Sequence, residues 1–534
     1  MKNAILRLSA LLTAVCLIAG IPLAYAADGY DYAYTYTYDY WSDLRYSPDA
    51  YRVSDFLTSA SLELETPMSN PKGLFVRDND VYICDTGNNR IVQLRRENGV
   101  FSFVREIKEI KGAIKDVRII TVNGKPTLLR IEDLENRSVS MDPGTDLVKP
   151  STTFSGPTDI YVGADGMMYI ADPGNNRIVK LDPDLNYVHS FVQPTDPTYD
   201  QSKAFLPSKL VADVSGRVFC LATNINMGVM TYEADGEFTG FIGAAPVKYS
   251  WYELIWRMFS TKEQRAQQAS LVATEYDNIA IDDKGFFYVV TQTFDENDLK
   301  GGAAEPIRRL NSLGTNILIE NGTYPPIGDI QWAAGNLNIT KSGPSLFVDM
   351  TVLDNNIYVA LDEKHNRLFG YDHQGNMLWA FGGVGNAQGY FNLPSAIEHM
   401  DHDLLVLDSQ AASLTVMTPT EYGKLIYKAS DEYNRGLYDQ SADTWLEVLK
   451  RNGNYDLAYI GIGRAELQRG NYETACESFK MARDDDNYSE AFRYYRSELV
   501  ENNIGWIFAL VAAGLVIPAV IGRIKKIKRE VDNA

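Results

Sequence analysis

The side chains of this chain that could perform metal chemistry are few and widely spaced. A catalytic zinc site needs about three protein ligands that converge on one point, and histidine is the commonest of them. The sequence contains five histidines: His189, His365, His373, His399 and His402. Two of them flank Met400-Asp401 in one predicted loop and two fall in predicted turns, so we do not expect them to converge. Asp and Asn residues are frequent in the predicted turns, which leaves a calcium ion open.

Two nearly identical stretches carry a carboxylate, two amides and an arginine close together. They are VYICDTGNNRIVQL at residues 81–94 and MYIADPGNNRIVKL at residues 168–181. The residues concerned are Asp85, Gly87, Asn88, Asn89 and Arg90, and Asp172, Gly174, Asn175, Asn176 and Arg177. Such a set could bind a ligand. We favour the interpretation that these residues stabilise the turn itself. Asp caps a turn, Gly takes a positive φ that Asn also tolerates, and Arg can pair with the carboxylate of a neighbouring turn.

No other chemical motif stands out, so we predict no catalytic residue, no metal ligand and no cofactor. The sequence has no glycine-rich phosphate loop, nucleophile elbow or paired histidine–carboxylate motif. Beyond the first 26 residues only Cys84, Cys220 and Cys476 remain, and three scattered cysteines make no disulfide framework. The first two lie in apolar strand patterns, which favours buried thiols. The sequence therefore predicts a protein that is not an enzyme.

Length and charge restrict the class of protein. A chain of 534 residues is too long for one ordinary core, so we expect several domains. The net charge of −20 argues against nucleic acid as a partner, because phosphate binding needs clustered Lys and Arg.

Both ends of the chain carry membrane-related signals. Residues 1–26 resemble a secretory signal, with a basic start, an apolar stretch and a small-x-small site at Ala24-Tyr25-Ala26; an uncleaved anchor is the alternative. Residues 504–522 contain no charge and are long enough to span a bilayer, although a buried soluble helix would have the same composition. The tail at 523–534 is basic, so the positive-inside rule places it in the cytoplasm. We expect a single-pass protein of the cell membrane, with the bulk of the chain extracytoplasmic.

Between residues 56 and 429 the pattern is mainly β, with short strands separated by turn residues. The two best hairpins are 87 residues apart, from Asn88 to Asn175, and four strands in roughly forty residues make one propeller blade. Counting along the chain gives seven candidate blades, one of them a degenerate unit at 114–140. A ring of six blades with one irregular excursion is an equal alternative.

The D-x-G-N-N-R-I-V hairpins resemble NHL repeats, the units of NHL-type β-propellers. A third, partial copy contains Asp362, Asn366 and Arg367. The resemblance implies a six- or seven-bladed NHL-type propeller. It implies little about activity, because related propellers include binding modules as well as enzymes that hold a metal at the axial opening.

Two segments break the strand pattern of this region. Residues 249–276 have helical spacing and present Trp251, Trp256 and Phe259. This pattern predicts contact with a partner or with a membrane surface, and the alternative is packing onto the propeller. Residues 27–55 are rich in tyrosine, which suits either an adhesive, carbohydrate-contacting ribbon or a tail that packs along the next domain.

Residues 430–502 have a helical pattern with a period of 34, which resembles two tetratricopeptide (TPR) repeats. A further helix at 489–500 is expected to cap the pair. The residues that would pack these TPR-like hairpins are Gly436, Tyr438, Trp445, Gly463, Gly470, Tyr472, Ala475, Phe479 and Ala482.

Together these features predict a membrane-anchored binding or scaffold protein. Its propeller and TPR-like surfaces would meet protein partners of the cell envelope, such as a membrane transporter, and the propeller could also take a glycan or a small ligand. The alternative is an extracytoplasmic metal-dependent hydrolase or lyase that uses the axial cavity of the propeller.

Overall fold

The computed structural model describes most of the chain between residues 35 and 532. The described residues are 35–39, 41, 43–122, 125–136, 147–243, 276–282, 284–291, 299, 304–320, 325–329, 343–353 and 356–532. The expected signal at 1–26 and the insertion with Trp251, Trp256 and Phe259 lie outside these residues. The chain forms two compact units, one of residues 1–38 and 44–424 and the other of residues 39–43 and 425–534.

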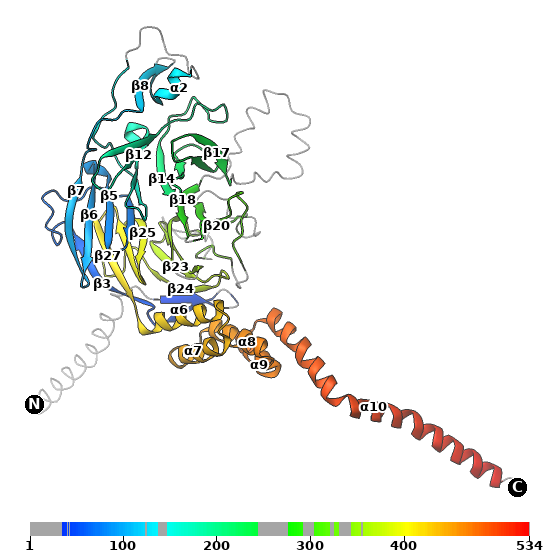
Figure 1. The fold of residues 1–534 in the computed structure, drawn as a ribbon. Helices are drawn as coiled ribbons and strands as arrows, with labels where there is room; N and C mark the ends of the chain where they lie inside the picture. Colours follow the sequence, from blue (N-terminus) through cyan, green and yellow to red (C-terminus); the bar gives the residue numbers. More distant parts are fainter. Residues whose placement is uncertain are drawn as a thin grey trace, which may run out of the picture. The chain divides into compact units, whose positions relative to one another are not determined.

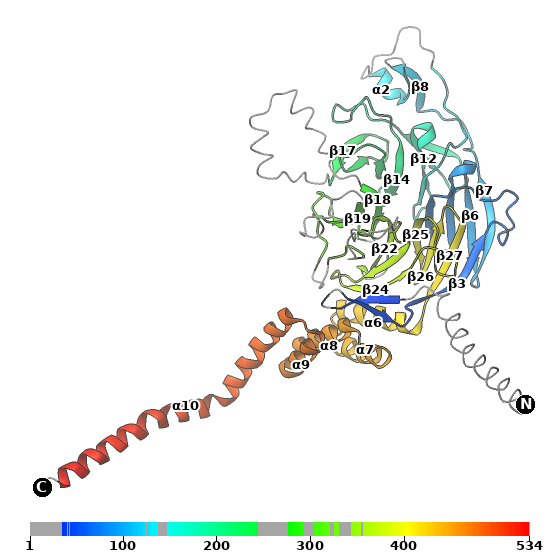
Figure 2. The same ribbon diagram turned by 180° about the vertical axis from the view of Figure 1, so that it is seen from behind.

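Six antiparallel sheets follow one another in the first unit (Figures 1 and 2). Blade 1 contains β4 (Gly73–Arg77), β5 (Asp80–Asp85), β6 (Arg90–Glu97) and β7 (Val100–Ile107). Blade 2 contains β10 (Asp159–Val162), β11 (Met168–Asp172), β12 (Arg177–Leu181) and β13 (Tyr187–Phe191). Blade 3 contains β14 (Pro207–Ala212), β15 (Val218–Ala222), β16 (Val229–Tyr232) and β17 (Phe238–Ile242).

The remaining blades complete the set. Blade 4 has three strands among the described residues, β18 (Tyr276–Ile281), β19 (Phe287–Thr291) and β20 (Ile307–Leu310). Blade 5 contains β21 (Phe347–Val352), β22 (Tyr358–Asp362), β23 (Arg367–Tyr371) and β24 (Met377–Gly382). Blade 6 contains β25 (Pro394–Met400), β26 (Asp403–Asp408) and β27 (Ser413–Pro419), and its fourth strand is β3 (Tyr51–Thr58) from near the start of the chain.

These sheets form a closed six-bladed β-propeller. The first strand of each blade contacts the first strand of the next, and β25 of blade 6 contacts β4 of blade 1. Strand β3 pairs with β27 from Thr58 opposite Ser413 to Tyr51 opposite Pro419, so both ends of the β region build blade 6. This pairing holds the ring shut with backbone hydrogen bonds and leaves β3 as the outer edge of the blade.

The alternative of seven blades is not what the structure shows. The expected degenerate unit at 114–140 contains only a hairpin, β8 (Val117–Val122) with β9 (Lys125–Arg130), followed by the short helix α2 (Ile131–Glu135). Two strands cannot make a blade face of their own. Val117 and Leu128 instead pack into the core between blades 1 and 2, so the segment is an excursion from a ring of six.

The core of the propeller lies between blades. One cluster joins Ile91 of blade 1 to Ile170 and Val179 of blade 2, and another joins Leu405 of blade 6 to Val92 of blade 1. Each blade is covered on both faces by its neighbours, and central strands such as β11, β15 and β22 are therefore buried along their whole length. This explains their continuous apolar sequences.

Part of the tyrosine-rich segment is built into the propeller. Strands β1 (Thr35–Tyr38) and β2 (Leu44–Ser47) extend blade 5, where Tyr36 lies opposite Ala380 of β24. Tyr36 is fully buried. These residues therefore pack along the domain, as in the second of the two interpretations, and the β region begins before the expected boundary at residue 56.

The second unit is helical. It contains most of α6 (Glu421–Asn434), together with α7 (Tyr438–Arg451), α8 (Asp456–Arg469), α9 (Tyr472–Ala482) and α10 (Asp485–Asp532). From α7 onward each helix contacts the next. A Cβ on Gly463 would lie 2.7 Å from the Phe479 ring, so this glycine permits the close approach of α8 and α9.

Helix α10 differs from the expectation of a short capping helix followed by a separate membrane segment. It runs for 48 residues without a break, about 72 Å at 1.5 Å per residue. Figure 1 draws it in orange to red. Its first turns pack against α9, with Ala491 fully buried, and the 504–522 segment continues the same helix. Among the described residues, this is the one helix long and apolar enough to span a membrane.

Candidate functional site

Six equivalent positions surround the propeller axis, one near the start of the first strand of each blade. In every blade the residue at this position pairs with the penultimate residue of the second strand, for example Asp159 with Ala171 and Asp349 with Leu361. We call these positions the axial ring: Gly73, Asp159, Lys209, Asn278, Asp349 and Ala396.

The local backbone helps to aim these side chains. In blades 3 to 6 a β-bulge immediately precedes the ring position, as between Pro207 and Lys209 or between Phe347 and Asp349. A bulge bends its strand and redirects the side chains beside it, and bulges are frequent next to functional sites.

The polar members of the axial ring interact with one another across blades. The Nζ atom of Lys209 lies 3.7 Å from Asp349 Oδ2 and 4.0 Å from Asp159 Oδ1. Each carboxylate also accepts a backbone N–H of the following blade, Asp159 from Leu210 at 2.8 Å and Asp349 from Ile397 at 2.9 Å. Asn278 donates its side-chain amide to Asp349. The ring therefore joins blades 2, 3, 4, 5 and 6 through charged and polar groups.

A second polar group lies farther along blades 5 and 6. We call Thr351, Glu398 and His399 the axial triad. Thr351 Oγ1 donates to Glu398 Oε2 at 3.1 Å and lies 2.7 Å from His399 Nδ1. Glu398 keeps 23% of its side chain exposed and His399 keeps 30%, whereas Thr351 is buried. Water can therefore reach two groups that protein otherwise surrounds.

Burial and mutual repulsion alter the acidity of these groups. Burial, partly offset by Lys209, raises the pKa of Asp159 to about 6. Burial together with the nearby Asp349 raises the pKa of Glu398 to about 8. Burial alone would lower the pKa of Lys209, but Asp349 and Asp159 outweigh it and the pKa is raised. Burial also raises the pKa of Asp349. Near neutral pH the axis therefore holds a lysine cation, a mainly ionised Asp159 and a mainly protonated Glu398.

The two full copies of the D-x-G-N-N-R-I-V turn use their polar side chains internally. Asp85 accepts from the Ser69 N–H at 2.7 Å, from Asn88 Nδ2 at 2.8 Å and from Arg90 Nε at 2.6 Å. Asp172 accepts the equivalent bonds from Ser155, Asn175 and Arg177 at 2.8, 2.8 and 2.9 Å. Asp85, Arg90, Asp172 and Arg177 are all buried. These four side chains are therefore not accessible to a ligand on the surface.

Two details of the predicted turn chemistry were wrong. The left-handed φ falls on Asn89 and Asn176, at 53° and 54°, and not on Gly87 or Gly174. The glycines are needed for close approach instead, since a Cβ on Gly87 would lie 2.6 Å from the Ser69 carbonyl oxygen. Each arginine pairs with the aspartate of its own turn, not with a neighbouring turn, because the two side chains face each other across the first pair of the hairpin.

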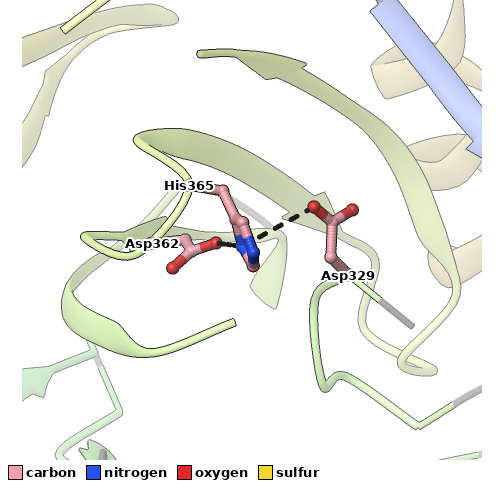
Figure 3. A group of neighbouring side chains, drawn as sticks. All are labelled: Asp329, Asp362 and His365. Atoms are coloured by element: carbon pink, nitrogen blue, oxygen red, sulfur yellow. Dashed lines mark hydrogen bonds and ion pairs between the residues drawn. The ribbon is translucent and has the colours of Figure 1, made fainter. Parts of the chain in front are cut away.

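The partial third copy of the turn brings together a possible metal-binding group. Asp329, Asp362 and His365 offer ligand atoms within 4.8 Å of one another, and they are the one such group among the described residues. Figure 3 shows Asp362 and His365 coming from one turn and Asp329 from a separate loop. His365 Nδ1 lies 2.7 Å from Asp362 Oδ2 and 3.7 Å from Asp329 Oδ2.

The surroundings of this group do not suit a metal ion. His365 occupies the place of Asn88 in the first turn and makes the same kind of bond to the turn aspartate. Arg367 Nη1 lies 2.6 Å from Asp329 Oδ2 and already supplies the positive charge there. Tyr36 and Tyr38 donate to the other oxygen of Asp329, at 2.6 and 2.9 Å. A metal would have to displace Arg367, so the group is better described as a structural network that fastens β1 to blade 5.

The other histidines lie elsewhere. His189 pairs with Asp116 at 2.7 Å on the outer strand of blade 2. His373 follows the end of β23, and His402 lies in the turn between β25 and β26. His399 belongs to strand β25, not to a loop as expected.

A hollow of about 720 Å³ lies between blades 1 and 6. It is lined by the turns β4–β5, β6–β7 and β25–β26, together with Lys424. Arg96 and Asp403 pair across it at 2.7 Å. Its walls mix polar and apolar surface and carry both signs of charge, so the hollow favours no single class of ligand.

Sequence reasoning missed both the axial ring and the axial triad. A signal for the ring was present, because a proline stands two residues before Gly73, Asp159, Lys209 and Ala396. The signal for Glu398 and His399 was that two adjacent polar residues stand in strand β25. The equivalent strand of blade 1, β4, has the apolar residues Phe75 and Val76 at these positions. Reading either signal required an alignment of the blades that the weaker repeats did not provide.

Comparison with known proteins identifies no family and no activity for this chain. No family profile and no curated protein matches this sequence. Among solved structures, a catalytically inactive virginiamycin B lyase from Staphylococcus aureus with quinupristin is similar, with 13% identity over 68% of this chain and 99% of that chain and a TM-score of 0.36. A structural genomics protein of unknown function from Bacteroides thetaiotaomicron has 11% identity over 71% of this chain and 79% of that chain, with a TM-score of 0.38. Because both TM-scores are low, the propeller assignment rests on strand pairing.

Proposed function

We propose that this protein is a single-pass, membrane-anchored binding protein that presents an NHL-type propeller and a TPR-like helical arm on the extracytoplasmic side. The observation that carries the proposal is the continuity of α10. Its first turns belong to the packed helical unit, and in its apolar part, residues 504–522, every residue except Ala513 is exposed. An unpaired apolar surface of this length is unfavourable in water and favourable in a bilayer.

The helical arm supports binding more than catalysis. Phe479 of α9 packs against Gly463 of α8, and Trp445 of α7 packs against Gly461 of α8, so that a large side chain meets a glycine at two successive helix pairs. Stacked helical hairpins of this kind offer an extended surface to a partner. The arm adjoins the anchor in the sequence, so we propose that the partner is another envelope protein, such as a membrane transporter.

A cross-linking experiment in intact cells tests this proposal. The full chain, purified through its C-terminal tail after cross-linking, should repeatedly recover one envelope protein with cross-links to α7–α9. A Gly463→Trp variant should lose those cross-links. Gly453→Trp should keep them, because Gly453 is exposed and a Cβ there would make only an ordinary contact, 3.8 Å from the Leu449 carbonyl oxygen. Cross-links that survive in a chain with disrupted helices would contradict the arm as the docking surface.

The second candidate is a hydrolase or lyase that acts at the axis. It is favoured by one arrangement, the partly exposed Glu398 and His399 that Thr351 joins by hydrogen bonds. The raised pKa of Glu398 would suit a general acid. Hydrolysis of lactone or glycoside substrates by the purified chain, lost in Glu398→Gln, would support this function. Equal hydrolysis rates for the natural chain and Glu398→Gln would exclude Glu398 as the general acid.

A further inference from the structure

The interface between blades 5 and 6 contains a hydrogen-bonded chain that can hold a proton in more than one place. Thr351 of β21 contacts both Glu398 and His399 of β25, so its hydroxyl bridges two blades. If Glu398 is ionised, the hydroxyl donates to it and accepts from His399 Nδ1–H. If Glu398 is protonated, the carboxyl donates to Thr351 and the hydroxyl donates to His399. Both arrangements satisfy every contact.

The two arrangements differ in the charge on Glu398. Three carboxyl groups, Asp159, Asp349 and Glu398, share the cation of Lys209. Asp349 is already held by the Ile397 N–H, the Met350 N–H and the Asn278 amide. Glu398 has less support, since its Oε2 accepts only longer bonds, at 3.1 and 3.2 Å. When the three carboxyl groups share one cation, Glu398 is therefore the group that gains most from a proton.

The surrounding elements add no second cation to this group. The other charged residues on the elements packed against β25 have partners of their own. They are Asp403, paired with Arg96; Asp408, bonded to the Asn392 and Leu393 N–H groups; Asp362, paired with His365; and Arg77, which donates to the Val162 carbonyl. Asp401, in the turn after β25, is exposed.

We propose that the axial triad and Asp349 form a pH-sensitive latch between blades 5 and 6, closed while Glu398 holds a proton and weakened when Glu398 ionises. Ionisation places a second carboxylate opposite Asp349 across this interface. Blade 6 is also the blade built from both ends of the β region, so a weaker contact here loosens the closure of the ring. The latch lies on the propeller and does not depend on the membrane anchor.

The expected pH dependence has a definite sign. The pKa of Glu398 is raised to about 8 in the folded protein, above the ordinary value for Glu. At a pH between these two pKa values, Glu398 holds a proton in the folded state that it has lost in the unfolded state. The free energy of unfolding therefore falls as pH rises through this range, and the contribution of Glu398 no longer changes above about pH 8. The unfolding equilibrium constant should increase by up to about tenfold per pH unit. Solvent screening makes the increase smaller, because the Glu398 side chain is 23% exposed.

The test compares thermal unfolding of the full chain in detergent micelles from pH 6 to pH 9. The Tm of the natural chain should fall between pH 6 and pH 8, and Glu398→Gln should remove most of that slope. An exposed carboxylate serves as control, since Asp78→Asn keeps the left-handed φ of 52° that Asn tolerates and should leave the slope unchanged. An equal slope in Glu398→Gln and the natural chain would overturn the proposal.

A second measurement uses the natural chain and needs no variant. Hydrogen exchange of the peptide that covers β25, corrected for the intrinsic rate at each pH, should show a several-fold loss of protection between pH 6.5 and pH 8.5. The β11 peptide of blade 2 should show no such loss. Protection of β25 that is independent of pH would contradict the latch even if Glu398→Gln did not fold.

Discussion

Lys209 balances two buried carboxylates that belong to blades on different sides of the axis. Removing one partner of a buried ionic group leaves the others uncompensated and is strongly destabilising. We expect Lys209→Met to lower the free energy of unfolding of the full chain by about 3–5 kcal/mol. Chemical denaturation measures this change. Lys72→Met, at an exposed position beside the ring residue Gly73, should cost less than about 0.5 kcal/mol. Equal effects of the two substitutions would show that the axial pairs do not stabilise the ring.

The turn arginines make a second residue-scale prediction. The side chain of Arg90 is 1% exposed and donates to Asp85 and to the Thr66 carbonyl, whereas Arg95 is 45% exposed and pairs with Asp80. A lysine cannot reproduce the planar fork of a buried arginine. Arg90→Lys should therefore cost about 2 kcal/mol, the loss of one or two charge-assisted bonds, while Arg95→Lys should cost less than about 1 kcal/mol. Denaturant unfolding of both variants checks the difference, which would vanish if the buried network carried no stability.

At the scale of elements, the hairpins were predictable and the blade count was not. The D-x-G-N-N-R-I-V pattern contains its own turn and strand chemistry, so β5–β6 and β11–β12 follow from local sequence. The hairpin β8–β9 has the same strand propensity as a blade. Only the contact of β4 with β10 and the pairing of β27 with β3 show that it stands outside the ring. Both are contacts between residues far apart in sequence, which local patterns do not encode.

The same limit applies to the axial site. Each ring residue looks ordinary in its own strand, and its importance appears only when six strands meet at one axis. Sequence could indicate that Asp349 is polar in an apolar strand, but not that Lys209 lies 3.7 Å away. The apolar segment that could span a membrane was easier to recognise, because a run of 19 uncharged residues needs no tertiary information.

The packing of α8 against α9 gives a prediction for the helical unit. A side chain at Gly463 would enter the space of the Phe479 ring, whereas a Cβ at the exposed Gly453 would lie 3.8 Å from its nearest neighbour, the Leu449 carbonyl oxygen. Gly463→Trp should unfold the helical unit, because overpacking of this size cannot be absorbed by a rotamer change. Limited proteolysis should then cut α7–α9 and leave the propeller intact. A Gly463→Trp chain that resists protease as well as Gly453→Trp would refute this account of the packing.

At the scale of the whole molecule, the proposed topology depends on which parts of α10 lie on each side of a membrane. The described natural cysteines, Cys84, Cys220 and Cys476, are all buried and should not react with a bulky reagent. Ser497 is exposed on α10 before the apolar segment, and Lys526 lies in the basic tail after it. Single cysteines at these two positions therefore report on the two sides of the span.

Labelling of Ser497→Cys and Lys526→Cys in intact cells with a membrane-impermeant maleimide is the most direct test of the proposed anchoring. The account predicts that position 497 reacts in intact cells, while position 526 reacts only after the membrane is permeabilised. Reaction of both positions in intact cells, or of position 526 alone, would contradict a single span with the propeller outside and the tail in the cytoplasm.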